Sequence, residues 1–230
     1  MVDAFIFDVD GVIVDSPHER AWGEALRDLM AVEWRNLRAA VRYSPELYTS
    51  DVYRLYVAGR PRADGAAALL AYFGIDDPHG ARAALLCERK QRLIERLIER
   101  GEFRAYDDAL RFLAAAKHCG AKLAAASSSK NANALLAGLD LLRLFDANVC
   151  GRDFAHGKPH PDIFLAAAEA LGVEPDRCVV IEDAPNGVAA AKAGGMRCIG
   201  VARGEDAELL ASAGADWVVG TLDDVDPADL

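Results

Sequence analysis

The chain has 230 residues, 52% hydrophobic and 27% charged, which is typical of a globular protein with one core or a core and an insert. Its formal net charge of −10 argues against nucleic acid and anionic membranes as partners, because both attract clustered lysine and arginine. No apolar run reaches the roughly 18 residues that a membrane span needs, and the acidic start does not fit a signal peptide.

The first predicted element is a strand over residues 4–7, a short apolar run that ends at Asp8. From residue 16 the pattern changes, and apolar residues recur at helical spacing without a clear strand. We therefore predict an α/β core of residues 1–15 and 95–230, with a helical domain of residues 16–94 inserted after the first strand. The apolar stripes of this insert include Trp22, Leu26, Leu29, Leu69, Leu70, Phe73, Leu86 and Ile94.

Beyond the insert, short apolar runs alternate with helical patterns. Short and nearly continuous apolar runs are typical of strands buried on both faces, as in a parallel sheet. The alternation predicts a doubly wound, mainly parallel α/β sheet. The predicted strands are residues 122–126, 178–181, 198–201 and 216–219, and the predicted helices are residues 107–117, 131–139, 161–171 and 187–193.

Residues able to carry chemistry follow several of these strands. In an open α/β sheet, ligands bind beyond the carboxyl ends of the strands, near the point where the strand order reverses. Carboxylates that converge there repel one another unless a cation lies among them, and oxygen ligands with open water positions suit Mg²⁺. A lysine and a hydroxyl beside that ion would bind a phosphoryl group. These residues are Asp8, Asp10, Ser127, Lys158, Glu182 and Asp183.

Each motif taken alone also has a purely structural interpretation. Asp8-Val9-Asp10-Gly11 could be turn chemistry, and Ser127-Ser128-Ser129 could be an ordinary loop. Lys158 could be a surface lysine, and Glu182-Asp183 could cap the next helix. The functional interpretation depends on all four occurring together, in this order.

As a set, the four motifs resemble those of the haloacid dehalogenase superfamily of phosphotransferases. The resemblance implies a Rossmann-like core with an inserted helical cap. It also implies that Asp8 attacks phosphorus and becomes an aspartyl phosphate, while Asp10 protonates the leaving oxygen and later activates the acceptor. Ser127 would hold a phosphoryl oxygen, and Lys158 would neutralise charge near Asp8. The implied Mg²⁺ ligands are Asp8, the Asp10 backbone carbonyl, Glu182 and Asp183.

Within that superfamily, three local matches resemble the beta-phosphoglucomutases. Val12 stands where many plain phosphatases of the group have threonine. The segment 58–62 resembles a cap loop that contacts the sugar phosphate, and Glu88-Arg89-Lys90 resembles part of a cap helix that faces the active site. The segment 126–131 is similar to the mutase phosphate loop. The substrate-binding residues implied are His18, Gly59, Arg60, Arg62, Lys90, Ser127, Ser128, Ser129, Lys130 and Asn131.

The cap departs from the mutase pattern in two places. The stretch between Ser16 and His18 is about two residues shorter, and the stretch between Trp22 and Gly59 is longer. The longer stretch adds aromatic residues, which we interpret as packing of the helical bundle rather than a sugar platform. They are Trp34, Tyr43, Tyr48, Tyr53 and Tyr56.

A mutase must exclude water from the phosphoenzyme and hold a bisphosphate in two orientations, which requires a second anion site. Arg62 and Lys90 on a closing cap would supply that site, although both could instead be solvated helix charges. We therefore favour a Mg²⁺-dependent sugar phosphomutase that converts beta-glucose 1-phosphate to glucose 6-phosphate with glucose 1,6-bisphosphate as phosphoryl donor. The alternatives are a phosphatase for sugar phosphates or other small metabolites and, less favoured, a non-catalytic binding protein.

The expected partner is a small phosphorylated sugar, with no nucleic acid and no membrane. The five cysteines include no CxxC pair, which predicts reduced and mostly buried thiols in a cytoplasmic protein. Nothing in the sequence requires more than a monomer.

Overall fold

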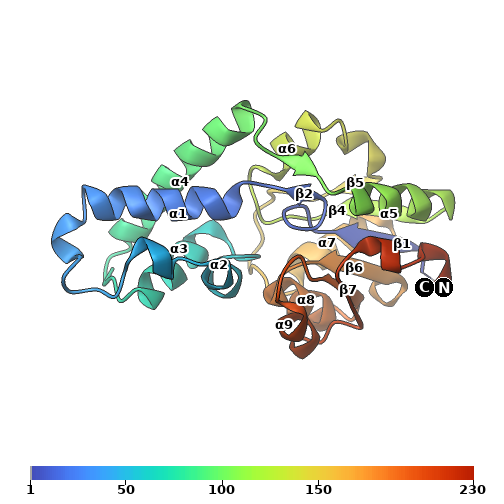
Figure 1. Ribbon diagram of the computed structural model, residues 1–230. Coiled ribbons are helices and arrows are strands. Elements are labelled where there is room, and N and C mark those ends of the chain that lie inside the picture. The colour runs from blue at the N-terminus through green and yellow to red at the C-terminus, as the bar shows by residue number, and fades with distance from the viewer. Residues whose placement is uncertain (1) are drawn as a thin grey trace. The chain divides into compact units, whose positions relative to one another are not determined.

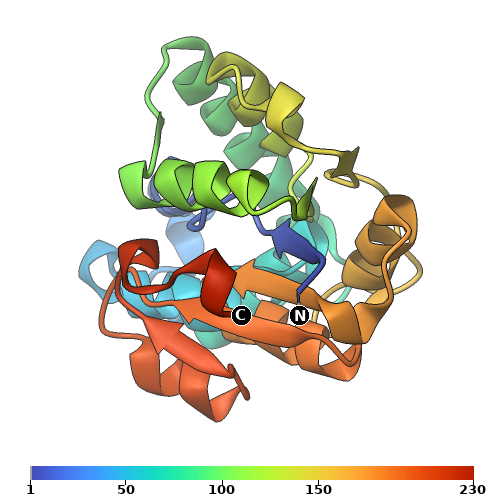
Figure 2. The same cartoon turned by 90° about the vertical axis from the view of Figure 1, so that its right-hand side faces the viewer.

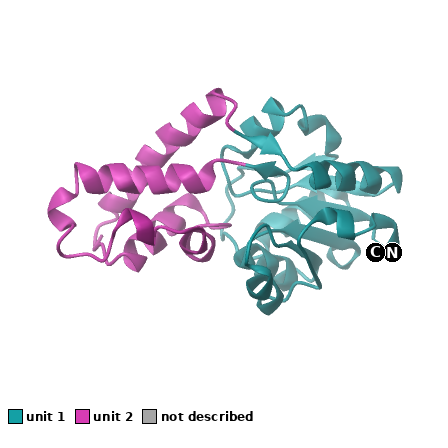
Figure 3. Cartoon of the chain, viewed as in Figure 1, with its two compact units in different colours: residues 1–15, 103–230 teal, residues 16–102 magenta. Residues whose placement is uncertain are grey.

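In the computed structural model, which describes residues 2–230, the chain divides into two units (Figure 3). Residues up to Asp15 together with Phe103–Leu230 form the α/β unit, and Ser16–Glu102 form the helical unit. The second boundary therefore lies at 102/103 and not at the expected 94/95. The reason is that helix α4 (Ala81–Glu99) continues without a break past residue 94 and keeps the following residues in the helical unit.

The α/β unit is built on a six-stranded sheet in the order β5-β4-β1-β6-β7-β8, with every neighbouring pair parallel (Figure 1). The predicted doubly wound parallel sheet is confirmed. Strand β5 was not predicted, because two residues are too short to produce an apolar run. The strands are β1 (Ala4–Phe7), β4 (Lys122–Ala125), β5 (Ala147–Asn148), β6 (Cys178–Glu182), β7 (Arg197–Val201) and β8 (Trp217–Val219).

Strand β1 lies at the centre of the sheet and has helices on both of its faces (Figure 2). The rings of Phe5 and Phe7 pack edge-on against Phe112 of α5, with centroids 5.2 and 6.0 Å apart. The alternate residues, Ala4 and Ile6, belong to the buried cluster formed with α7, α8 and α9. These helices are α5 (Asp107–His118), α7 (Asp162–Leu171), α8 (Pro185–Ala193) and α9 (Ala207–Ser212).

The position of β1 also creates the switch point of the sheet. From β1 the chain proceeds to β4 and β5 on one side and then returns to β6, β7 and β8 on the other. Ligands bind at such a point, beyond the carboxyl ends of the strands. The remaining elements of this unit are α6 (Ala132–Gly138) and a short antiparallel pair, β2 (Val14–Asp15) and β3 (Arg104–Ala105).

The helical unit contains four α-helices within its described residues, and none of those residues lies in a strand. The apolar stripes predicted from the sequence are buried as expected. Trp34 is also buried, Tyr43 packs edge-on against Phe73, and Tyr56 packs on Tyr72, so these added aromatic residues serve packing within the unit. The helices are α1 (His18–Ala31), α2 (Ser50–Tyr56), α3 (Arg62–Tyr72) and α4.

All five cysteines are free thiols, and three of them, Cys150, Cys178 and Cys198, are buried. Across residues 2–230, no helix combines the length and the apolar character needed to cross a bilayer.

The packing of β1 against α5 can be tested with Phe112→Ala. Removing a buried phenylalanine ring should lower the free energy of unfolding by about 3–5 kcal/mol, because the cavity would remove contacts to Phe5 and Phe7. Urea denaturation followed by circular dichroism measures the change. Leu165→Ala, at a position 38% exposed on α7, is the control and should cost much less. Equal losses in the two variants would contradict this account of the core.

Candidate active site

A buried ion pair lies at the carboxyl end of β1. The Asp8 backbone N–H donates to the Ile181 carbonyl (3.0 Å), which extends the pairing of β1 with β6 by one residue. The Lys158 ammonium, from the loop between β5 and α7, donates to Asp8 Oδ1 (2.6 Å) and also to Glu182 Oε1. No part of the Lys158 side chain is exposed. Residues distant in the sequence therefore meet at one point, as the strand-end pattern predicted.

Burial governs the protonation of this pair. It raises the pKa of Asp8 to about 7, although the Lys158 ammonium acts in the opposite direction. Burial also acts to lower the pKa of Lys158, but Asp8 and Glu182 outweigh it and raise that pKa above its ordinary value. The two acidic neighbours therefore favour the charged form of Lys158 beside Asp8.

The turn after β1 positions Asp10. The Ile13 and Val14 N–H groups both donate to the Val9 carbonyl, and the turn closes through Gly11, whose φ is +87°. Such a φ favours glycine, because a Cβ would clash with the backbone there. Asp10 Oδ2 accepts a hydrogen bond from the Ser127 hydroxyl (3.3 Å), which places the predicted acid–base group beside the predicted phosphate ligand.

Ser127 lies two residues beyond the end of β4 and is buried. Its hydroxyl oxygen accepts from the Ser129 N–H (3.1 Å), and the Ser129 hydroxyl oxygen accepts from the Asn131 N–H (3.2 Å). The loop is thus held by its own side chains. The Lys130 ammonium donates to the Gly151 carbonyl and to Asp153 (2.6 Å each), so in this structure it is engaged by the 151–153 loop. The predicted phosphate contacts of Ser128, Ser129, Lys130 and Asn131 stay predictions.

The carboxylates of Glu182, which ends β6, and Asp183, which follows it, differ in their contacts. Both Glu182 oxygens have partners, because Oε1 accepts from Lys158 and Oε2 accepts from the Ala184 N–H (2.8 Å). Asp183 instead packs against Gly11, where an added Cβ would lie 1.9 Å from Asp183 Oδ2. Burial, with Glu182 and Asp8 nearby, raises the pKa of Asp183 well above its ordinary value.

This donor set fits a hard divalent cation. Four acidic side chains lie around a single ammonium, and burial together with their mutual repulsion raises the pKa of both Asp8 and Asp183, which a bound cation would offset. The Asp183 carboxylate lies beside the turn that carries the Asp10 carbonyl. Mg²⁺ is commonly bound by one or two carboxylates together with waters and substrate phosphate. Within residues 2–230, no three or more His, Cys, Asp and Glu side chains form a metal cage by themselves, although the predicted ligands include the carboxylates of Asp8, Glu182 and Asp183. Because both Glu182 oxygens already have partners, Asp8, Asp183 and the Asp10 carbonyl are the better candidates as ligands.

The predicted substrate-binding residues of the helical unit form their own cluster. Lys90 is buried, with its ammonium 3.3 Å from His18 Nδ1 and 5.6 Å from the centre of the Trp22 ring. The Cys87 thiol, which is on the same helix as Lys90, donates to the Arg62 carbonyl (3.6 Å), and both cations act to lower its pKa, which burial nevertheless keeps raised. The cluster is therefore cationic.

The neighbouring loop adds Gly59 and Arg60. Gly59 has a positive φ of +72°, and the buried Arg60 Nε has no hydrogen-bond partner among residues 2–230. The roles of Gly59, Arg60, Arg62, Lys90 and His18 toward a substrate stay predictions.

One residue that holds the site together was missed from the sequence. Arg203 donates to the carbonyls of Gly11 (3.2 Å) and Val12 (3.1 Å), directly after Asp10. A signal was present, since Arg203 follows the predicted strand 198–201 and so lies at the same edge of the sheet as the other site residues.

Comparisons with known proteins agree with this geometry. The sequence matches the haloacid dehalogenase-like hydrolases over residues 2–195. The chain belongs to this family. It is 36% identical over 239 residues to a beta-phosphoglucomutase of Mycobacterium bovis, covering 96% of this chain and 90% of the relative. It is 35% identical over 218 residues to a phosphorylated carbohydrates phosphatase of Thermotoga maritima, covering 93% and 92% of the two chains.

Among solved structures of the haloacid dehalogenase-like family, the fold is similar to that of beta-phosphoglucomutase from Clostridium difficile. The TM-score is 0.77 at 27% identity, covering 98% of this chain and 93% of the other. The named relatives include both phosphomutases and phosphatases, and the protein is accordingly an enzyme of this family whose reaction is one of the two.

The contact between Gly11 and Asp183 can be tested with Gly11→Ala. The new methyl group would displace the Asp183 carboxylate, so we expect the affinity for Mg²⁺, measured by titration calorimetry, to fall about 10- to 100-fold. Gly120→Ala is a matched control, because Gly120 has a similar φ of +80° with nothing within 4 Å of an added Cβ. Both variants should lose about 1–2 kcal/mol of stability from backbone strain. Unchanged Mg²⁺ affinity in Gly11→Ala would argue against Asp183 as a ligand.

Proposed function

We propose that this enzyme is a Mg²⁺-dependent sugar phosphomutase that acts through an aspartyl phosphate on Asp8. The observation that carries the proposal is the Asp8 carboxylate, buried at the switch point of the sheet and 2.6 Å from the Lys158 ammonium. A carboxylate attacks a phosphoryl group readily once neighbouring positive charge offsets the repulsion between the two anions.

In the first step, an Asp8 carboxylate oxygen bonds to phosphorus and the bond from phosphorus to the sugar oxygen breaks. The Asp10 carboxyl gives its proton to that departing oxygen. Lys158 stabilises the charge that develops near Asp8, and the Ser127 hydroxyl, already a partner of Asp10, orients a phosphoryl oxygen. A bound Mg²⁺, held by Asp8, the Asp10 carbonyl and Asp183, would neutralise phosphate charge during this chemistry.

In the second step, a hydroxyl of the sugar phosphate gives its proton to the Asp10 carboxylate and bonds to phosphorus, and the bond to Asp8 breaks. Asp8 is then again a free carboxylate and Asp10 is again protonated, as both were before the first step. A mutase uses a sugar hydroxyl here, whereas a phosphatase uses water. The same residues serve either acceptor, so whether the enzyme acts as a mutase or as a phosphatase depends on how well the sugar hydroxyl competes with water for the phosphoryl group.

Two features favour the sugar as acceptor. The helical unit provides a cationic cluster with a buried Lys90 and a neighbouring Arg62, and a bisphosphate needs such a second anion site. The mycobacterial relative is named a beta-phosphoglucomutase and aligns over nearly the whole chain. We therefore propose beta-glucose 1-phosphate as the substrate and glucose 6-phosphate as the product.

The second candidate is a sugar-phosphate phosphatase. It is favoured by the Thermotoga maritima relative, a phosphatase of phosphorylated carbohydrates with nearly the same identity to this chain.

One experiment separates the two candidates. The purified enzyme is given beta-glucose 1-phosphate, a catalytic amount of glucose 1,6-bisphosphate and Mg²⁺, and both glucose 6-phosphate and free phosphate are measured. We expect glucose 6-phosphate without stoichiometric free phosphate. Free phosphate as the main product would favour the phosphatase. An Asp8→Asn variant should be inactive in either case, because an amide cannot form the phosphoenzyme.

The second anion site can be tested with Arg62→Ala. Loss of the guanidinium should lower phosphomutase turnover about 10- to 100-fold while leaving the hydrolysis of 4-nitrophenyl phosphate, which has one phosphate, nearly unchanged. Arg92→Ala, on the exposed face of α4 where Arg92 pairs with Glu88 (3.3 Å), is the matched control and should change neither rate. Equal losses of both activities in Arg62→Ala would contradict the assignment.

A further inference from the structure

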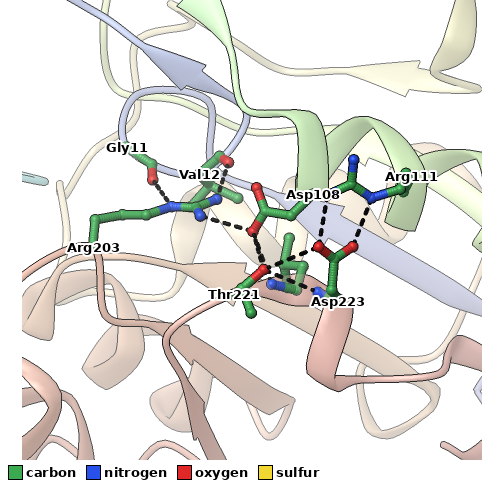
Figure 4. A network of polar contacts seen from close by, with 8 residues as sticks. Gly11, Val12, Asp108, Arg111, Arg203, Thr221 and Asp223 are labelled. Carbon is green, nitrogen blue, oxygen red and sulfur yellow. Dashed lines mark hydrogen bonds and ion pairs between the residues drawn. The ribbon is translucent and has the colours of Figure 1, made fainter.

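Arg203 connects the catalytic turn to the rest of the α/β unit (Figure 4). Its Nε donates to the Gly11 carbonyl (3.2 Å) and one terminal nitrogen donates to the Val12 carbonyl (3.1 Å). The other terminal nitrogen donates to Asp108 Oδ2 (2.7 Å). One planar guanidinium thus binds two consecutive carbonyls of the turn and a carboxylate of α5. This arrangement uses the fork geometry of arginine, which a lysine ammonium cannot reproduce.

Asp108 is the fixed point to which Arg203 is anchored. Besides Arg203, its Oδ2 accepts from the Leu222 N–H (2.8 Å) and from the Thr221 hydroxyl (3.1 Å). The Asp108 side chain is 8% exposed and that of Arg203 is 17% exposed, so water screens this pair only weakly. Burial acts to raise the pKa of Asp108, but the Arg203 and Leu222 hydrogen bonds outweigh it and hold that pKa below its ordinary value.

Tyr106 supports Arg203 from a second direction. The guanidinium carbon lies 3.9 Å from the centre of the Tyr106 ring, a cation–π contact. The Tyr106 backbone N–H donates to the Ile13 carbonyl (2.9 Å), so the residue whose ring supports Arg203 is also bonded to the same turn through its main chain. The turn is therefore held at three successive carbonyls, those of Gly11, Val12 and Ile13.

We propose that Arg203 is a positioning residue for phosphoryl transfer, which holds the turn after β1 so that Asp10 can give its proton to the leaving oxygen. This inference rests on the proposed function, in which Asp10 is the acid. Arg203 itself does not touch the reacting atoms. It acts through the Gly11 carbonyl, next to Asp10, and Gly11 is also the surface on which the Asp183 carboxylate packs.

A positioning role makes a specific kinetic prediction for Arg203→Met, which keeps the apolar stem but loses the fork. A misplaced general acid should slow phosphoryl transfer from esters with a poor leaving group far more than from esters with a good one. We expect kcat/KM to fall about 100-fold for a sugar phosphate, whose alkoxide needs a proton, and less than about tenfold for 4-nitrophenyl phosphate. Arg203→Lys should recover part of the loss by restoring one of the contacts.

The three contacts of Arg203 with the Gly11 and Val12 carbonyls and with Asp108, here called the clamp, can also be tested without measuring turnover. In the metal-free enzyme, amide hydrogen exchange followed by mass spectrometry should become faster over residues 9–14 in Arg203→Met, because the turn loses two of its carbonyl contacts. The control is Arg111→Ala, which removes the paired hydrogen bonds from Arg111 to Asp223 (2.7 and 2.6 Å) at the outer end of the same network (Figure 4). It should leave both the exchange over residues 9–14 and the kinetics unchanged.

These measurements separate a failure of the positioning role of Arg203 from a failure of the proposed function. Equal losses of kcat/KM for the two esters would assign Arg203 a merely structural role and overturn the proposal, as would exchange over residues 9–14 equal to that of Arg111→Ala. An Asp8→Asn variant that keeps its activity would instead overturn the proposed function, while the exchange measurement would still test the clamp.

Discussion

The active end of this protein depends on one buried ammonium held between two carboxylates. Lys158, with no exposed side-chain surface, donates to both Asp8 and Glu182, which follow or end two neighbouring central strands. Removing charges from water is costly, and such a group is tolerated only when its charge and its hydrogen bonds are satisfied. Losing any one of Asp8, Lys158 and Glu182 would leave an uncompensated buried charge. The pairing of β1 with β6 and the path of the loop that carries Lys158 therefore constrain one another.

That constraint explains why much of the site could be predicted from the sequence. Asp8, Ser127 and Asp183 stand directly beyond apolar runs, and a parallel sheet brings the carboxyl ends of its strands to one edge. The ends of the apolar runs, together with this rule, therefore predicted that these side chains would lie at the same edge of the sheet. The helical insert could be predicted in the same way, because its apolar stripes have the helical period and are buried as expected.

The rest depends on side-chain contacts that no local pattern encodes. The bonds from Arg203 to Gly11 and to Asp108 join positions 192 and 95 residues apart, and Arg203 itself follows a strand without any motif to mark it. The Lys130 ammonium, expected at phosphate, is bound by the 151–153 loop because Asp153 lies within reach. The second unit boundary was misplaced because α4 shows no break at residue 94, and a continuous helix gives no signal of where one packing unit ends.

The contacts of Arg203 with the turn after β1 have a consequence for the order in which the site forms during synthesis. Asp10 is made 193 residues before Arg203, and Leu222, whose N–H donates to Asp108, is made later still. Until Arg203 has been made, the turn that carries Asp10 lacks the hydrogen bonds from the guanidinium to the Gly11 and Val12 carbonyls. The turn therefore reaches the arrangement described above only after strand β7 and the residues that follow it have been made and have folded onto the sheet.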